Sequence, residues 1–277
     1  MNVKQIWQET KLKKIAIPSF NFSSADVALT IARTIKTFNH ICLISTSERE
    51  LKFQSIEVVV SIASALKKQG FPIFLNLDHG KTDEVIKRAI DLRFDCIHFD
   101  GSELSLEENI KKTKEIVFLC KDKNISVEGE VGRIGGSSTV SDESTGESVL
   151  TDPTQATRFV KETGVDILAC SFGSYHGLSL KDKKLKTDIL DTISKETNIP
   201  FVLHGGSGIE DSEIRKAIMA GVVKINFNTE LRLAWSTGIK DHFASNPKDI
   251  LPVNVLSKAD ERVKFVLEKK IKLCLNS

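Results

Sequence analysis

One stretch, Ile73-Phe74-Leu75-Asn76-Leu77-Asp78-His79-Gly80, decides how the rest of this 277-residue sequence is interpreted. Its apolar run begins after Pro72 and ends in a carboxylate, an imidazole and a glycine. A short run of branched and aromatic residues bounded by turn residues is typical of a buried strand. Polar groups are costly to bury without partners, so Asp78 and His79 either cap a helix and pack in the core or take part in chemistry.

Two more His-Gly pairs follow apolar, strand-like runs, at His176-Gly177 and His204-Gly205. Half of the six histidines of the chain are therefore found in the same local context. This recurrence favours a functional site over three separately buried histidines. The other three histidines differ: His40 and His242 are expected at helix ends, and His98 within a strand, in the core or in contact with site residues.

The composition is that of an ordinary globular protein, with 40% hydrophobic and 27% charged residues. Lys and Arg number 39 against 37 Asp and Glu, with no block of one sign, so neither a nucleic-acid nor a membrane partner is predicted. The five cysteines contain no CxxC pair and are expected to be reduced thiols. With no apolar leader segment at the N-terminus, a cytoplasmic location is expected.

Strand-like and helix-like segments alternate along the whole chain. Eight strands are predicted, at residues 15–21, 41–47, 73–80, 96–100, 125–131, 165–172, 200–203 and 222–227. Helices are predicted at 3–10, 24–38, 54–69, 82–92, 105–120, from 153, and at 187–196, 211–220, 230–244 and 257–274. The polar segment 132–152 is expected to be an irregular loop that acts as a lid.

Such an alternation predicts either a closed (β/α)8 barrel or an open doubly wound sheet. Polar residues follow nearly every strand, whereas an open sheet would gather them at one switch point. We therefore predict an α/β fold, a single (β/α)8 TIM barrel over residues 1–277 with extra C-terminal helices. No GxGxxG or P-loop motif is present, so the sequence gives no support for nucleotide binding.

Closing the barrel would bring His79, His176 and His204 to one mouth. Three imidazoles there could hold Zn²⁺ and leave a fourth position open. The loops at 205–208 and 226–229 each lead from a strand into a helix, and in this fold such loops commonly bind phosphate through free backbone N–H groups. Taken singly, either loop is equally well explained by turn glycines and helix caps. Together they favour phosphate.

These residues resemble the class II, metal-dependent fructose-bisphosphate aldolases over nearly the whole chain. The resemblance lies in FNF at 20–22, STSE at 46–49, NLDHG at 76–80, FDGS at 99–102, VEGEVGRIGG at 127–136, GSYHG at 173–177, LHGGSG at 203–208 and KINFNTELR at 224–232. It implies a TIM barrel that reversibly cleaves a ketose 1,6-bisphosphate, above all fructose 1,6-bisphosphate, into dihydroxyacetone phosphate and glyceraldehyde 3-phosphate. A homodimer or homotetramer is expected.

The resemblance also implies roles for individual residues. One Zn²⁺ per chain would be held by His79, His176 and His204, and Asp78 would be the catalytic aspartate. The phosphorylated ketone half of the sugar, or a monovalent cation as a further cofactor, would contact Gly177, Gly205, Ser207, Asn226, Asn228 and Thr229. We also predict substrate contacts for Asn21, Ser47 and Lys181.

Asp78 would accept the proton of the C4 hydroxyl during cleavage, and a loop glutamate would return a proton to C3. Glu143 is favoured over Glu147 because it lies closer to Gly135-Gly136, which give the loop its freedom.

The sequence departs from the family pattern at four places. Asn76 replaces a frequent histidine, Ser137-Ser138 replace loop acids, and Leu178 to Lys181 differ from the usual residues after the His-Gly pair. The arginine that some members give to the second phosphate has no clear counterpart, since Lys258 and Arg262 are only near that place. Tagatose bisphosphate or another ketose phosphate is thus an alternative substrate. A metal-dependent hydrolase or a non-catalytic barrel that binds a phosphorylated ligand are alternatives of another class.

Overall fold

A computed structural model describes residues 3–140, 148–178 and 184–276 of the chain. Eight parallel strands close into a barrel in the order β1-β10-β9-β7-β5-β4-β3-β2. The bounds of these strands are β1 (Ile17–Asn21), β2 (Cys42–Ser47), β3 (Ile73–Gly80), β4 (Cys96–Phe99), β5 (Ser126–Val131), β7 (Ile167–Cys170), β9 (Phe201–Leu203) and β10 (Val222–Phe227). The predicted (β/α)8 barrel is confirmed.

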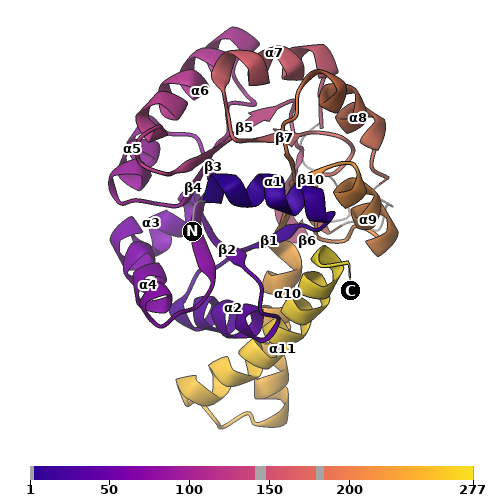
Figure 1. Cartoon of the computed structure of the whole chain (residues 1–277). Coiled ribbons are helices and arrows are strands. Elements are labelled where there is room, and N and C mark those ends of the chain that lie inside the picture. The colour runs from indigo at the N-terminus through magenta and orange to yellow at the C-terminus, as the bar shows by residue number, and fades with distance from the viewer. Residues whose placement is uncertain (1–2, 141–147, 179–183, 277) are drawn as a thin grey trace.

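Helices surround the barrel as an outer ring (Figure 1). Those between strands are α2 (Ala25–Thr37), α3 (Glu48–Gln54), α4 (Ile56–Lys68), α5 (Asp83–Asp91), α6 (Leu106–Cys120), α7 (Pro153–Thr163), α8 (Thr187–Glu196) and α9 (Asp211–Met219). The extra C-terminal helices are α10 (Thr229–Ser245) and α11 (Pro252–Cys274). Apolar residues on one face of each helix fill the layer between helices and strands, as the amphipathic spacing predicts.

The first helix, α1 (Val3–Lys13), crosses the amino-terminal end of the barrel (Figure 1). Val3, Ile6 and Trp7 pack there against the innermost residues of the strands. The Trp7 indole N–H donates to Ser126 Oγ at 2.8 Å, so its one polar atom is satisfied in the core. The amino-terminal end is thus covered, and the polar residues gather at the opposite end.

One helix was not predicted, and one predicted helix boundary was wrong. The unpredicted helix is α3, which begins directly after β2 and precedes the helix expected at 54–69. Ser47 accepts the Glu50 N–H and Glu50 accepts the Ser47 N–H, a reciprocal cap that starts a helix at once. The last helix begins at Pro252 and not at 257, because proline is well suited to the first turn.

The segment expected to be wholly irregular contains a strand. β6 (Gly136–Val140) pairs in parallel with β8 (His176–Leu178), and the two form a small sheet outside the barrel. A β-carbon on Gly136 would lie 2.3 Å from the His176 carbonyl oxygen, so only glycine allows this approach. His176 therefore lies on a separate strand beyond β7, and not at the end of the longer strand predicted at 165–172.

Other features bear on the remaining expectations. All five cysteines are buried free thiols. Within the described ranges, no helix is long and apolar enough to span a membrane. Exposed apolar side chains gather where α10 turns into α11, including Phe243, Ile250, Leu251 and Val253. Assembly into a homodimer or homotetramer stays a prediction.

Candidate active site

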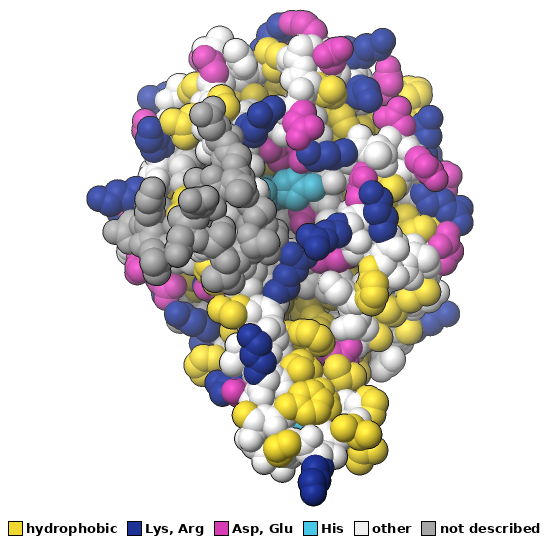
Figure 2. All heavy atoms as spheres, turned by 180° about the vertical axis from the view of Figure 1, so that it is seen from behind, with side chains coloured by type: hydrophobic (Ala, Val, Ile, Leu, Met, Phe, Trp, Pro, Cys, Tyr) yellow, Lys and Arg dark blue, Asp and Glu magenta, His cyan; other side chains and the backbone are white. Residues whose placement is uncertain are grey.

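A cavity of about 450 Å³ opens at the carboxyl-terminal end of the barrel. Figure 2 looks onto this end, where histidine reaches the surface among acidic and basic side chains. Every predicted site residue that the structure describes lines the cavity: Asn21, Ser47, Asp78, His79, His176, Gly177, His204, Gly205, Ser207, Asn226, Asn228 and Thr229. Glu143, Glu147 and Lys181 lie outside the described residues.

The end of β3 bends so that two adjacent side chains enter the cavity. Along a regular strand, Asp78 and His79 would point to opposite faces. His79 instead has a φ of 51°, and the pairing of β3 with β4 shifts register between Leu77 and Gly80. Asp78 and His79 both line the cavity for this reason.

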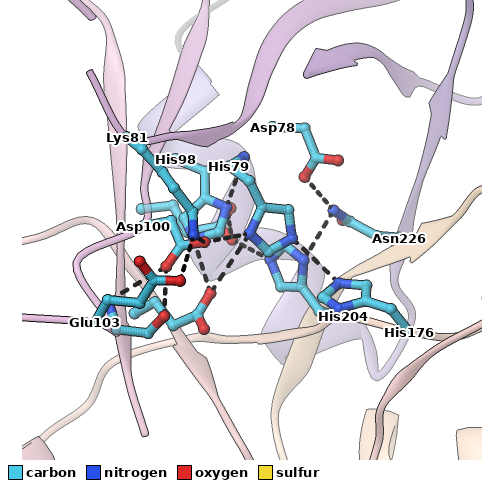
Figure 3. A network of polar contacts seen from close by, with 12 residues as sticks. Asp78, His79, Lys81, His98, Asp100, Glu103, His176, His204 and Asn226 are labelled. Atoms are coloured by element: carbon cyan, nitrogen blue, oxygen red, sulfur yellow. Dashed lines mark hydrogen bonds and ion pairs between the residues drawn. The ribbon is translucent and has the colours of Figure 1, made fainter. Parts of the chain in front are cut away.

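The three predicted metal ligands meet in this cavity (Figure 3). Nε2 of His79 lies 3.2 Å from Nε2 of His176. The ring centroids of His79 and His204 are 4.6 Å apart, and those of His176 and His204 are 6.0 Å apart. The three imidazoles therefore face a common space, although they come from three separate parts of the chain.

In two of the three rings, a carboxylate fixes which nitrogen carries a proton. Nδ1 of His79 is 2.9 Å from Asp100 Oδ2, and Nε2 of His204 is 2.7 Å from Glu128 Oε1. A carboxylate can only accept, so these two nitrogens donate. In the neutral rings the lone pairs are therefore on Nε2 of His79 and on Nδ1 of His204, and carboxylates behind the ligands orient histidines in this way in zinc sites. Nδ1 of His204 is 3.3 Å from the Asn226 side-chain amide, which a metal ion would displace.

The spacing of the nitrogens fits a metal ion. Two nitrogens bound to one tetrahedral Zn²⁺, each about 2.0–2.1 Å away, lie about 3.3 Å apart. The 3.2 Å between Nε2 of His79 and Nε2 of His176 is close to this value. Ligand atoms of Asp78, His79, His98 and His204 lie within 4.8 Å of one another, a group that includes two of the three predicted ligands but not His176. The residues present thus fit a divalent cation.

The charges around the cluster also favour a cation. Burial opposes a charged imidazole, yet the carboxylates of Asp78 and Asp100 raise the pKa of His79 to about 9. Burial and the positive charge of His79 lower the pKa of His176 to about 3. The cluster thus holds one positive charge against several carboxylates. A bound divalent ion would replace the His79 proton and better balance these carboxylates.

Asp78 is held as an ionised carboxylate. Its Oδ2 accepts from the Asn21 amide at 3.0 Å, and its Oδ1 accepts from the Asn226 amide at 2.8 Å. Burial opposes the charge, but the nearby positive charges of His79 and Lys224 hold the pKa of Asp78 below its usual range. A carboxylate that stays ionised at neutral pH can accept a proton from a substrate hydroxyl.

Lys224 and Glu128 form a buried ion pair below the cluster. Lys224 Nζ lies 2.5 Å from Glu128 Oε2, and both side chains are almost fully buried. Burial opposes the Glu128 charge, but Lys224 and the neighbouring histidines hold the pKa of Glu128 well below its usual value. Glu128 therefore stays an acceptor and keeps His204 in the tautomer described above.

Glu50 joins three parts of the cavity wall, and sequence reasoning missed it. Its carboxylate accepts from the Ser47 N–H at 2.8 Å, from the Asn21 amide at 3.1 Å and from Arg232 at 2.7 Å. The Ser-x-x-Glu spacing at 47–50 was a readable signal for this helix cap. Through Asn21, Glu50 also supports Asp78.

Backbone groups after β9 and β10 line the far side of the cavity. Gly205 has a φ of 64°, and a β-carbon there would lie 2.3 Å from the Tyr175 carbonyl oxygen. Asn228 precedes α10, whose 17 residues begin at the cavity with Thr229. The amino end of a helix carries free N–H groups and partial positive charge, so this side suits a phosphate.

Four basic residues line the cavity and were not predicted as site residues: Arg49, Lys81, Arg133 and Arg232. Lys81 is 3.0 Å from Glu103, and Arg232 is paired with Glu50. Arg49 and Arg133 form no ion pair with any residue that the structure describes. The sequence could have indicated three of them, because Arg49, Lys81 and Arg133 lie one or two positions after strands β2, β3 and β5.

Comparisons with known proteins agree with this site. The family model described as "Fructose-bisphosphate aldolase class-II" matches residues 1–277. The chain is 37% identical over 268 residues to a 6-phospho-5-dehydro-2-deoxy-D-gluconate aldolase of Shouchella clausii (strain KSM-K16), covering 95% of this chain and 90% of that protein.

Two solved structures are similar over nearly the whole chain. The YdjI aldolase from Escherichia coli K12 superposes with a TM-score of 0.85 at 28% identity, over 98% of this chain and 95% of that one. A putative fructose-1,6-biphosphate aldolase from Coccidioides immitis superposes with a TM-score of 0.86 at 28% identity, over the same shares of the two chains.

Proposed function

Because the chain belongs to the class-II fructose-bisphosphate aldolase family, we propose that it is a zinc-dependent aldolase that reversibly cleaves a phosphorylated ketose. One observation carries this proposal. Three convergent histidines, a buried ionised carboxylate and the amino end of a helix share one cavity. These groups are what a retro-aldol cleavage of a phosphorylated ketone requires.

His79, His176 and His204 are the proposed ligands of one Zn²⁺. Neutral imidazoles suit this ion, and the carboxylates behind His79 and His204 orient the rings. When bound, zinc supplies a Lewis acid that polarises the substrate carbonyl.

Asp78 is the proposed general base. Its two oxygens are fixed by Asn21 and Asn226, so the carboxylate is oriented before substrate arrives. It would accept the proton of the hydroxyl next to the breaking C3–C4 bond. Glu143 as the donor of a proton to C3 stays a prediction from the sequence.

The phosphate beside the ketone would bind at Gly205, Ser207, Asn226, Asn228 and Thr229, with Asn21, Ser47 and Gly177 around it. Replacing Ser207 by Asp places a like charge at this anion site. We expect the KM to rise by about 10- to 100-fold, which corresponds to roughly 1–3 kcal/mol of repulsion between nearby charges. The Ser207→Ala variant, which adds no charge, is the matched control. Equal KM values for the Asp and Ala variants, both folded, would show that the phosphate binds elsewhere.

Fructose 1,6-bisphosphate is the proposed substrate. Arg49 and Arg133 line the same cavity as the phosphate loops and form no ion pair with a described residue, so they can offer two positive charges to a second anionic group. A phosphate dianion matches two arginines well. This pair could also do the work of the arginine that the sequence lacks near its C-terminus.

A second substrate is favoured by the relative at 37% identity. As its name says, 6-phospho-5-dehydro-2-deoxy-D-gluconate has the same phosphorylated carbon next to a ketone. It differs at the other end, where a carboxylate replaces the second phosphate. The same two arginines could bind this carboxylate, so the choice between the substrates depends on the far end of the cavity.

A direct comparison of the two sugars tests the proposal. We expect dihydroxyacetone phosphate from fructose 1,6-bisphosphate, with activity lost on chelation and restored by Zn²⁺. Arg49→Gln and Arg133→Gln should each lower kcat/KM by about 10- to 100-fold, the usual loss for a charged hydrogen bond. A higher kcat/KM for the gluconate would assign that substrate instead. Release of inorganic phosphate without cleavage would indicate a hydrolase, and tight binding without turnover a binding protein.

A further inference from the structure

His98 is a buried histidine next to the proposed metal ligands that the proposed reaction does not use. It lies on β4 and is fully buried. Its ring centroid is 4.6 Å from that of His79 and 4.7 Å from that of His204 (Figure 3). By distance alone it could be a fourth ligand, so the contacts of its two nitrogens decide its role.

Nδ1 of His98 is occupied by a backbone group. The His79 backbone N–H donates to this nitrogen at 3.2 Å. A peptide N–H can only donate, so Nδ1 must present its lone pair and carry no proton. Neutral His98 therefore carries its proton on Nε2.

Nε2 of His98 faces a carboxylate. It lies 3.2 Å from Glu130 Oε2, but the two atoms are not aligned for a hydrogen bond, and neither has another hydrogen-bond partner among the described residues. One nitrogen thus accepts from the His79 backbone, and the other carries the proton of the neutral ring beside Glu130. No lone pair is left on His98 for a metal ion.

The backbone that His98 holds is the unusual one. His79 is a non-glycine residue with a φ of 51°, in the left-handed region, which residues with a side chain rarely adopt. The register shift between Leu77 and Gly80 takes this part of β3 out of the regular pairing with β4. His98 supplies an acceptor for the His79 N–H at this irregular position.

We infer that His98 is a positioning residue for His79, an inference that rests on the proposed metal site. Its Nδ1 holds the His79 amide in the left-handed turn that sends the His79 ring and the Asp78 carboxylate into one cavity. His98 does not bind the metal ion. Without this acceptor, the His79 ring would lose its fixed direction toward His176.

Two substitutions distinguish the role of Nδ1 of His98 from that of Nε2. In His98→Asn, the amide oxygen takes the place of Nδ1 and can still accept the His79 N–H. In His98→Gln, the longer side chain reaches toward Glu130 but removes the acceptor at the Nδ1 position. His40→Gln, far from the cluster at the end of α2, controls for the loss of any histidine.

The measurement is the Zn²⁺ dissociation constant of each full-length apoprotein, by competition with a chromophoric chelator. We expect His98→Gln to bind Zn²⁺ about 10- to 100-fold more weakly, as is typical when a support of a metal ligand is lost. His98→Asn and His40→Gln should stay within about threefold of the wild type. Wild-type affinity in His98→Gln, or equal losses in the Gln and Asn variants, would overturn the inference.

A second measurement works even if a variant does not fold. The protein is labelled with ¹⁵N-histidine, and the His98 resonances are those that are present in the wild type and absent from His98→Asn. If that variant does not fold, His98→Gln or His98→Met serves for the same comparison. If no variant folds, the ring is assigned through its contact with the His79 amide. We expect an unprotonated Nδ1 and a protonated Nε2, both unchanged when Zn²⁺ is added. A zinc-induced shift like that of His79 would make His98 a ligand. If no histidine shifts and wild type binds no zinc, the proposed metal site itself is wrong.

Discussion

The Asp78→Asn variant is expected to keep its zinc and to lose turnover, with kcat lower by a factor on the order of 10² to 10⁴. An amide has nearly the shape of a carboxylate but cannot take a proton from a substrate hydroxyl. Both oxygens of Asp78 accept hydrogen bonds, one from the Asn21 amide and one from the Asn226 amide. The loss should therefore fall on proton transfer and not on metal binding.

The surroundings of Asp78 explain why the amide cannot simply rearrange. Asn21 also donates to Glu50 at 3.1 Å, and Asn226 also contacts His204 Nδ1 at 3.3 Å. Turning either amide over would set its oxygen against a carboxylate or a lone pair. The side-chain NH₂ group of Asn at position 78 must then point toward the NH₂ group of Asn21 or Asn226. This unfavourable contact should lower the free energy of unfolding by about 1–3 kcal/mol.

Metal content, melting temperature and kcat, measured on the same preparation, distinguish the possible roles of Asp78. Asp78→Ala removes the unfavourable N–H contact as well as the base. If proton transfer is the role, both variants are slow, both keep zinc, and added formate partly restores Asp78→Ala. If zinc is lost together with activity, Asp78 supports the metal ion, and its assignment as the base is wrong.

The barrel could be predicted because it depends on a pattern repeated along the chain. Each strand-like run was followed by polar residues, and those residues now line one cavity. Strand lengths were less well predicted. Val165 and Phe172 are buried like strand residues but lie outside β7, since burial alone does not show which backbone groups pair.

Site residues could be predicted where a recognisable residue pair follows a strand, as the three His-Gly pairs do. Features that depend on contacts between distant segments could not be predicted. The left-handed turn at His79 requires an acceptor on β4, and the place of His176 requires β6 to pair with β8. The reciprocal cap between Ser47 and Glu50, and the basic residues just after strands, were visible in the sequence and were not used.

Removal of a proposed metal ligand is expected to remove both zinc and activity, and His176→Ala is the cleanest choice. His176 lies on the small sheet outside the barrel and is only partly buried. His204 is fully buried against Glu128, so its loss would leave a carboxylate without its donor and weaken the fold as well. Losing His176 should therefore affect the metal ion far more than the barrel.

The expected size follows from the binding energy of zinc sites. A four-ligand site contributes about 10–16 kcal/mol, so one ligand is worth about 2.5–4 kcal/mol, or about a 100- to 1,000-fold change in affinity. Dialysed His176→Ala should thus hold little zinc, show almost no cleavage, and melt near the temperature of the wild-type apoprotein. His40→Ala, which removes a histidine far from the cluster, should keep both zinc and activity. Full zinc content in His176→Ala would mean that the ion is held by another set, such as His79, Asp100 and Glu130, whose ligand atoms also lie within 4.8 Å of one another.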